Sequence, residues 1–377
     1  MLDDYLLLGL RLGRHVDGFV DSYYGPPRLA EQAEREEPVD PATLAVDAAR
    51  LATETDDAWL QAQLAGCETT ARRLAGEQIS WEDEVTRCYG VRPEQTDEAT
   101  FEAAHERLDA ALPGAGDLGE RFRDWQATQA LPTEHVLEAA ARFQAILRAR
   151  TLELLGLPDD EAAEIELVQN EPWSGFNYYL GGRRSRVVIN TDLPVYAYGV
   201  GGLVAHEIYP GHHAEHAWKE ALLVDGEGRL EETLQLTGTP QAVISEGIAM
   251  LAPEIVGADE VASDVYDELG IDYDAATADA VRSAREDLRG VATNAARLLH
   301  LDGASEDEVI DYYVHWQLVP RGHAEKMLEF LTHPAWRAYI SSYSSGYELC
   351  KRWVDGDATR FRRLLTERLS THDLLPA

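Results

Sequence analysis

Lysine is nearly absent from this chain, and basic residues of any kind are few. The 377 residues contain 33 Lys and Arg against 68 Asp and Glu, which gives a formal net charge of -35. The only lysines are Lys219, Lys326 and Lys351. Because so acidic a surface repels phosphate groups, the composition argues against binding to nucleic acid or to an anionic membrane. Such a surface is typical of proteins adapted to high salt, where ions screen the self-repulsion.

Cysteine and long apolar runs are also scarce. The three cysteines, Cys67, Cys88 and Cys350, are far apart and form no Cys-x-x-Cys pair. An odd, scattered set predicts reduced, buried thiols rather than a disulfide framework. No stretch approaches the ~20 apolar residues of a membrane span, and Asp3 and Asp4 are unlike the start of a signal peptide. We therefore expect a cytoplasmic protein without a membrane partner.

Most of the chain has the apolar periodicity of α-helices. Apolar residues recur at helical spacing in residues 5–19, 44–64, 101–112 and 136–155, and again through much of 191–377. Turn signals rich in Gly and Pro separate these segments, but no repeat or low-complexity linker marks a domain boundary. The sequence therefore predicts a mainly α protein. We expect a single domain over residues 1–377, with at most a shallow division near residue 160 into a helical wall (1–160) and a functional part (161–377).

One short region departs from the helical pattern. Residues 165–168 and 186–190 are rich in β-branched side chains and have the length of strands. Gly181-Gly182-Arg183-Arg184 fits a tight turn between Tyr178-Tyr179 and the second of these segments. We predict a small antiparallel β-sheet just before the most informative motif. Its edge could pair with an extended peptide, or the hairpin could simply cap the core, and the sequence favours neither.

That motif is His206-Glu207-Ile208-Tyr209-Pro210-Gly211-His212-His213, which places three imidazoles and a carboxylate within eight residues. Neutral imidazole is a common zinc ligand, and a neighbouring carboxylate can take a proton from a zinc-bound water. The string is similar to the His-Glu-x-x-His helix of zinc hydrolases, with extra residues before the second histidine.

The extra residues require a bend. On a straight helix, His206 and His212 lie on different faces, whereas His206 and His213 share a face but are about 10 Å apart along the axis. Zinc–nitrogen bonds of about 2.0–2.1 Å exclude both arrangements. Pro210 cannot continue the helix, because it lacks an N–H and clashes with the carbonyl four residues back, and Gly211 tolerates unusual backbone angles. We predict a break at Pro210-Gly211 that brings the second histidine back to the metal.

The identity of that second ligand stays open between His212 and the adjacent His213, which would otherwise hydrogen-bond to the residues around the metal. Glu215 is expected to be solvated. A third ligand is expected in residues 240–251, where Glu246 is the one carboxylate in an otherwise apolar helix, since a buried carboxylate is costly unless it is paired or binds metal. Glu254 is the nearest alternative.

The motif followed by Ser245-Glu246-Gly247 resembles the prokaryotic family called domain of unknown function 885, and Tyr23-Tyr24-Gly25-Pro26-Pro27 is also similar to that family. This family resembles the helical zinc peptidases: Taq-type carboxypeptidases, thimet-type oligopeptidases and angiotensin-converting enzyme. The resemblance would cover residues 23–353. It implies a helical zinc-peptidase-like body with a cleft.

Transferred residue by residue, the resemblance makes His206, His212 and Glu246 ligands of one Zn²⁺ ion and Glu207 the general base. Tyr343-Ser344-Ser345-Gly346-Tyr347 is similar to a Tyr-x-x-Gly-Tyr segment of the thimet-type enzymes, so that Tyr343 or Tyr347 would donate to the oxyanion. Other divalent metals suit the same donors.

These observations predict a zinc metallopeptidase that acts on a peptide or small amide. Two alternatives remain: a metal-binding protein without catalysis, and a zinc hydrolase of a non-peptide amide or ester.

Overall fold

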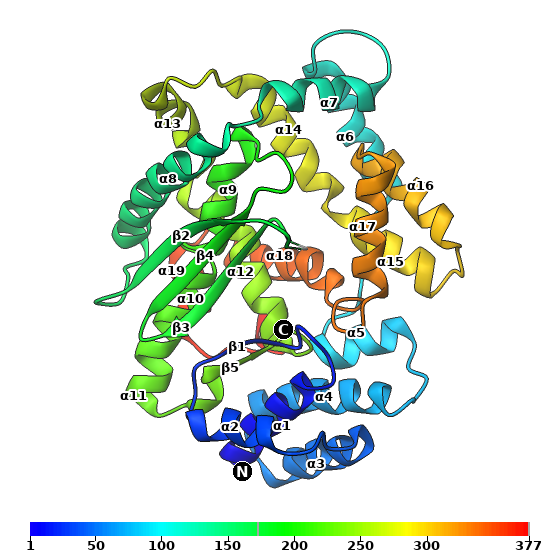
Figure 1. The fold of residues 1–377 in the computed structure, drawn as a ribbon, viewed down its shortest axis with the longest axis vertical. Helices are drawn as coiled ribbons and strands as arrows, with labels where there is room; N and C mark the ends of the chain where they lie inside the picture. The colour runs from blue at the N-terminus through cyan, green and yellow to red at the C-terminus, as the bar shows by residue number, and fades with distance from the viewer. Residues whose placement is uncertain (172, 376–377) are drawn as a thin grey trace.

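Helices account for most of the computed structural model, which describes residues 1–171 and 173–375 (Figure 1). The helices of the first 160 residues are α1 (Leu2–Gly13), α2 (Pro27–Arg35), α3 (Pro41–Glu54), α4 (Ala58–Leu74), α5 (Trp81–Tyr89), α6 (Glu98–Ala111), α7 (Leu118–Thr128) and α8 (Thr133–Leu154). The later helices are α9 (Ala197–Glu207), α10 (His212–Lys219), α11 (Asp225–Glu227), α12 (Pro240–Val256), α13 (Ala262–Leu269), α14 (Ala275–Asp287), α15 (Val291–His300), α16 (Glu306–Gln317), α17 (Arg321–Thr332), α18 (Ile340–Val354) and α19 (Ala358–Thr366). The mainly α prediction is confirmed.

Two predicted helical segments differ from the structure. Residues 44–64 fall into two helices rather than one, because Asp57 accepts hydrogen bonds from the backbone of Trp59 and Leu60 and so begins α4 as its N-cap. The segment 5–19 ends as a helix at Gly13 and leads into the short strand β1 (Val20–Tyr23). Apolar periodicity does not reveal such interruptions, since both sides of each break carry the same spacing.

The strands form two small sheets. β2 (Ala162–Val168), β3 (Gly175–Gly181) and β4 (Arg184–Asn190) are ordered β2-β4-β3. The β3–β4 hairpin is antiparallel as predicted, but β2 pairs with β4 in parallel, so this sheet is mixed. β1 pairs antiparallel with β5 (Leu234–Leu236) in a second, two-stranded sheet that the sequence did not predict.

The apolar core connects the early and late parts of the chain. One buried cluster holds Trp81 and Phe101 together with Ile248 and Tyr313, so helices from both sides of residue 160 share it. A second lies between α8, the mixed sheet and α9, and a third between α1, α3, α4 and β5. Within the described residues, none of the helices combines the length and the apolar character that a membrane crossing would require.

The close crossing of α12 and α18 sets the position of the later functional residues. A Cβ atom on Gly247 would lie 2.4 Å from the carbonyl oxygen of Gly346, and one on Gly346 would lie 2.3 Å from that of Val243. Backbone therefore packs directly on backbone at this point, which only glycine allows. Glu246, beside Gly247, is thereby held close to the start of α18.

Candidate metal centre

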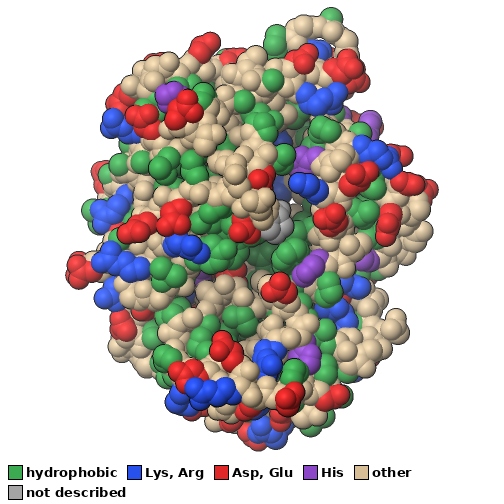
Figure 2. All heavy atoms as spheres, in the orientation of Figure 1, with side chains coloured by type: hydrophobic (Ala, Val, Ile, Leu, Met, Phe, Trp, Pro, Cys, Tyr) green, Lys and Arg blue, Asp and Glu red, His purple; other side chains and the backbone are tan. Residues whose placement is uncertain are grey.

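A pocket of ≈ 540 Å³ opens between the mixed sheet and the helices that follow it. Figure 2 shows a hollow near the middle of one face of the molecule, with hydrophobic side chains around it. The lining combines the histidines and carboxylates of the motif with aromatic side chains: Asp21, Trp173, Phe176, Asn177, Tyr178, His206, Glu207, His212, His216, Gln235, Ser245, Glu246, Phe330, Trp336, Tyr339 and Tyr343, among others.

The predicted break in the motif is confirmed. α9 ends at Glu207 and α10 begins at His212. The Gly211 N–H donates to the Ala205 carbonyl at 2.9 Å, which closes a tight reversal between the two helices. A Cβ atom on Gly211 would lie 1.7 Å from the carbonyl oxygen of His206, so only glycine fits there. The bend brings the rings of His206 and His212 to 4.8 Å between centroids.

The structure brings His206, His212 and Glu246 together. Their nearest ligand atoms all lie within 4.8 Å of one another. The Glu246 carboxylate lies 3.8 Å from His206 Nε2 and 3.6 Å from His212 Nε2. A tetrahedral ion with bonds of about 2.0–2.2 Å holds its ligand atoms about 3.3–3.6 Å apart, so the carboxylate already lies close to the required distances from both imidazoles.

One oxygen of the Glu246 carboxylate is unsatisfied. Its Oε2 is buried and has no hydrogen-bond partner among the described residues. Buried polar atoms are seldom left unpaired, and each exception requires an explanation. A divalent ion between the two imidazoles and this oxygen would supply one, so the residues present fit the metal that the motif implies.

A chain of hydrogen bonds orients His212. Ser245 Oγ donates to Glu215 at 2.6 Å and lies 3.1 Å from His212 Nδ1, so it accepts from that ring nitrogen. The Nδ1 atom then carries the proton, and the Nε2 lone pair faces Glu246. Lys219 binds the other oxygen of Glu215 at 2.6 Å. The prediction that Glu215 is solvated is wrong, because its side chain is fully enclosed by this network.

His213 faces away from the candidate centre. Its Nδ1 lies 2.8 Å from Ser185 Oγ and its Nε2 lies 2.9 Å from Glu161 Oε2. Tyr209 donates to the same Glu161 oxygen. Both nitrogens are thus taken up by protein groups, and the geometry favours His212 over His213 as the second ligand.

Burial controls the ionisation of the cluster. It lowers the pKa of His206 well below its usual range and that of His212 to about 4, which keeps both imidazoles neutral. Burial also raises the pKa of Glu246 to about 8 and that of Glu207 well above its usual range, and the Asp21 carboxylate adds to both increases. A cation in the centre would reverse the penalty on the carboxylates, because it stabilises their charged forms.

Only one of the two predicted tyrosines, Tyr343 and Tyr347, lies at the pocket. Tyr343 lines the pocket. Tyr347 does not: its hydroxyl binds Glu254 and Lys351, and the Arg289 guanidinium lies 3.6 Å from its ring centroid. α18 leads away from the pocket and four residues add about 6 Å of rise, so Tyr347 is one turn too far. The same contact places Glu254, the alternative ligand, outside the centre.

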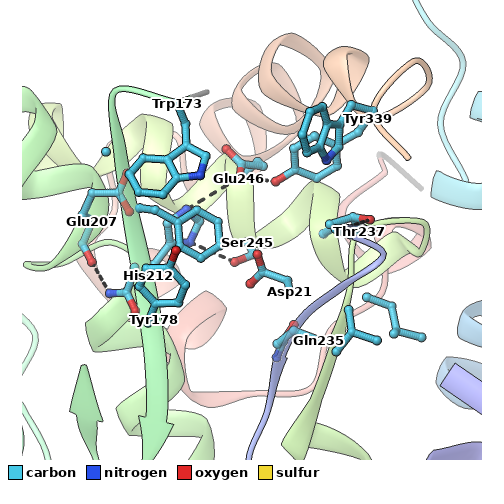
Figure 3. A pocket seen from close by; sticks show the side chains of 18 of the residues that line it. Asp21, Trp173, Tyr178, Glu207, His212, Gln235, Thr237, Ser245, Glu246 and Tyr339 are labelled. Atoms are coloured by element: carbon cyan, nitrogen blue, oxygen red, sulfur yellow. Dashed lines mark hydrogen bonds and ion pairs between the residues drawn. The ribbon is translucent and has the colours of Figure 1, made fainter. Parts of the chain in front are cut away.

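Sequence reasoning missed several pocket residues. Tyr339 donates a hydrogen bond to Glu246 Oε1. It could have been found by extending the four-residue tyrosine spacing one turn toward the N-terminus. Asp21 and Trp173 enter from distant elements, β1 and the segment before β3, and carry no local signal. Figure 3 shows both beside the His212 and Glu246 side chains.

No family model matches this chain, and no curated protein matches it. In fold it is similar to a protein from Colwellia psychrerythraea called a "putative lipoprotein", with a TM-score of 0.52 and 19% identity over 92% of this chain and 57% of that one. A "putative lipoprotein of unknown function" from Shewanella oneidensis gives a TM-score of 0.42 and 14% identity, over 91% and 70%. The chain spans less than two thirds of the length of the first, and the likeness shows the fold alone. The resemblance to domain of unknown function 885 stays a prediction.

Proposed function

We propose that this protein is a hydrolase that cleaves peptide bonds and uses one zinc ion held by His206, His212 and Glu246. The meeting of two imidazoles and a carboxylate in a pocket, with Glu207 beside them, carries the proposal. Three such ligands with one open position are the donor set of catalytic zinc sites, whereas structural sites are closed by four protein ligands. A bound ion would supply Lewis acidity toward a carbonyl and lower the pKa of a water in the pocket.

Glu207 is the group that would move the proton. Its side chain lines the pocket, is 8% exposed and lies 3.9 Å from His206 Nε2. The proposed ion would favour the charged form of Glu207, so that its carboxylate would be available to accept a proton from an attacking water. The same oxygen can then pass that proton to the leaving amine.

Tyr343 and strand β3 would position the substrate. Burial raises the pKa of Tyr343 well above its usual range, so its hydroxyl stays protonated and can donate to the oxygen that gains charge. β3 is an edge strand of the mixed sheet, and its residues Phe176, Asn177 and Tyr178 line the pocket. An extended peptide could pair with such an edge through backbone hydrogen bonds.

A peptide-library digest with and without a chelator tests the reaction class, alongside measurement of bound zinc. We expect one zinc per chain and cleavage that stops when zinc is removed and returns when it is restored. Zinc binding without turnover of peptides, amides or esters would indicate a metal-binding protein without catalysis. Cleavage of esters or non-peptide amides, without cleavage of peptides, would identify the protein as a hydrolase of those substrates instead of a peptidase.

The role of Glu207 is tested by Glu207→Gln. General-base catalysis contributes about 10²- to 10⁴-fold, so we expect turnover to fall by at least about 10²-fold while zinc stays bound. Glu254→Gln, at the far end of α12, is the matched control and should retain turnover. Full activity of Glu207→Gln would exclude Glu207 as the base.

The cytoplasmic location expected from the sequence stays a prediction. The Colwellia psychrerythraea protein of similar fold is called a "putative lipoprotein". Fractionation of the native cells would show whether this chain is in the cytoplasm or with the membrane.

A further inference from the structure

Asp21 is a pocket carboxylate to which the proposed mechanism gives no role. It lies at a register shift in the β1–β5 pair, between Val20, which pairs with Leu236, and Ser22, which pairs with Gln235. Such bulges redirect a side chain and are frequent beside active sites. Figure 3 shows the Asp21 carboxylate in the pocket, pointing toward Ser245 and Glu246.

The carboxylate of Asp21 is unpaired within the part of the chain that the structure describes. Among the described residues, none gives it a hydrogen bond or an ion pair within the usual distances. Burial, followed by the charge of Glu215, raises its pKa to about 7.

Asp17 and Glu171 also line the pocket, but Asp17 is exposed and Glu171 is partly exposed, so solvent screens their charges. With the proposed zinc in place, the remaining carboxylates of Asp21, Glu207 and Glu246 against a charge of +2 leave one negative charge. A single positive group on a ligand would balance it.

Two buried side-chain amides of the pocket residues each have one atom without a hydrogen-bond partner. Gln235 is 5% exposed and its Nε2 has no partner, while Asn177 is 6% exposed and its Oδ1 has none, both within the part of the chain that the structure describes. Both residues line the pocket, from β5 and β3, although the two unpaired atoms are themselves shielded from solvent. Buried polar atoms are normally satisfied, so these two amides are the groups that a small movement would make available to a polar ligand.

The remaining walls suit a cation and not an anion. Trp173 and Phe176 stack at 5.5 Å between centroids, and Phe330 stacks on Trp336 at 4.9 Å. Aromatic faces attract ammonium and guanidinium groups. Lysine and arginine are absent from the described residues that line the pocket, so apart from the proposed zinc a ligand carboxylate would find no cationic partner there.

We infer that the pocket binds the cationic amino or guanidinium group of its ligand at Asp21. For a peptide, whose cleavage rests on the proposed function, the group at this position is a free α-amino end or a Lys or Arg side chain. A free C-terminal carboxylate is excluded from it.

Binding of non-hydrolysable amines tests the inference without any turnover. Zinc-loaded protein is titrated by calorimetry with phenethylamine and with 2-phenylethanol, which differ in the cationic group. Charge-assisted hydrogen bonds discriminate by about 10- to 100-fold, so we expect the amine to bind at least tenfold more tightly. Asp21→Asn should abolish that preference with zinc content unchanged. Equal binding of the two probes, or a preference that survives Asp21→Asn, overturns the inference.

Asp17→Asn is the matched control. Asp17 also lines the pocket but is exposed, so its charge is solvated and screened. We expect the amine preference to change by less than about twofold. A loss as large as that in Asp21→Asn would mean that diffuse negative charge, rather than the Asp21 site, attracts the amine, and would overturn the assignment.

Peptides then identify the source of the cation. Ala-Ala-Ala amide is compared with its N-acetyl form, and N-acetyl-Ala-Lys-Ala amide with its norleucine analogue, by kcat/KM or by binding where no cleavage occurs. A tenfold preference within the first pair assigns the α-amino end, and one within the second pair assigns the side chain. Failure of the peptidase proposal would remove the kinetic readout but leave the phenethylamine result standing.

Discussion

His212 and His213 are neighbours at the start of α10, yet they occupy opposite kinds of site. His213 is fully enclosed, and both of its ring nitrogens bind protein groups, Ser185 and Glu161. His212 is partly exposed to the pocket; one nitrogen binds Ser245 and the other faces Glu246. The difference is that His212 keeps a ring nitrogen free to bind a metal and His213 does not, which makes His212 the candidate ligand.

The partners of the two residues extend the contrast. Around His213, Glu161 also binds Tyr209 and Arg148, so each group has a partner. Around His212, the Glu246 Oε2 atom has none among the described residues. The first network stabilises the bend itself, whereas the second leaves room for an ion. Substitutions in one network should therefore change stability, and substitutions in the other should change metal binding.

Gly211→Ala should have the largest effect, because it removes the bend on which both sites depend. A methyl group 1.7 Å from the His206 carbonyl forces the backbone apart. We expect the free energy of unfolding to fall by about 3 kcal/mol or more and zinc to fall well below one per chain. Denaturant unfolding and elemental analysis measure the two effects.

Gly199→Ala is the control for that change. Gly199 also lies in α9, but a Cβ there meets nothing within 4 Å. Alanine is favoured over glycine in a helix by about 0.5–1 kcal/mol, so stability should rise slightly. A Gly211→Ala protein as stable as wild type would contradict the tight reversal.

His213→Ala should have the next largest effect, which is a lower free energy of unfolding. The substitution removes one partner of the buried Glu161 carboxylate while Arg148 and Tyr209 remain, and loss of a hydrogen bond to a charged group costs about 1.5–3 kcal/mol. In chelator-treated protein, the free energy of unfolding measured with denaturant should therefore be lower than that of wild type by about this amount. His212→Ala should change this metal-free stability by less than about 1 kcal/mol while abolishing tight zinc binding. The reverse pattern would make His213 the ligand.

Ser245→Ala should have a smaller effect, confined to the metal. It removes the acceptor that holds the proton on His212 Nδ1, and loss of such an outer partner typically costs about 10- to 100-fold in metal affinity. Competition with a chromophoric chelator measures the change. Ser344→Ala is the control, since Ser344 lies on α18 and binds Thr293 instead. An unchanged affinity in Ser245→Ala would remove Ser245 from the site.

The smallest expected effect is a pH dependence in the His213 network. Burial acts to raise the pKa of Glu161, but hydrogen bonds from His213 and Tyr209 outweigh it and hold that pKa below its usual value. A lowered folded pKa gives stability that is present above the unfolded pKa of about 4.3 and is lost as the pH falls below it. In chelator-treated protein, the stability difference between wild type and Glu161→Gln should therefore shrink below about pH 4.3. A constant difference would contradict this assignment.

The local part of the site could be predicted from sequence. Pro210 and Gly211 break a helix by covalent geometry alone, so the bend followed from the residues themselves. Glu246 stood out because a lone carboxylate in an apolar helix needs a partner. Tyr347 was misplaced because spacing does not indicate in which direction a helix leaves a pocket.

The residues that reach the site from distant parts of the chain could not be predicted from the sequence. Asp21 reaches the pocket only through the pairing of β1 with β5, two strands of four and three residues that lie far apart in the chain. Strands this short have no readable alternation. Glu161 likewise meets His213 only once the mixed sheet has formed. Glu215 was mistaken for a surface charge, since its partners Ser245 and Lys219 are not visible as a set in the sequence.

The contact between Gly247 and Gly346 has a consequence for divergence. The separation of α12 and α18 at this point is set by main chain touching main chain. Distant homologues could therefore replace nearly every apolar residue around these two helices and still keep the same separation. The pair of glycines would be a better guide to shared chemistry in them than overall similarity.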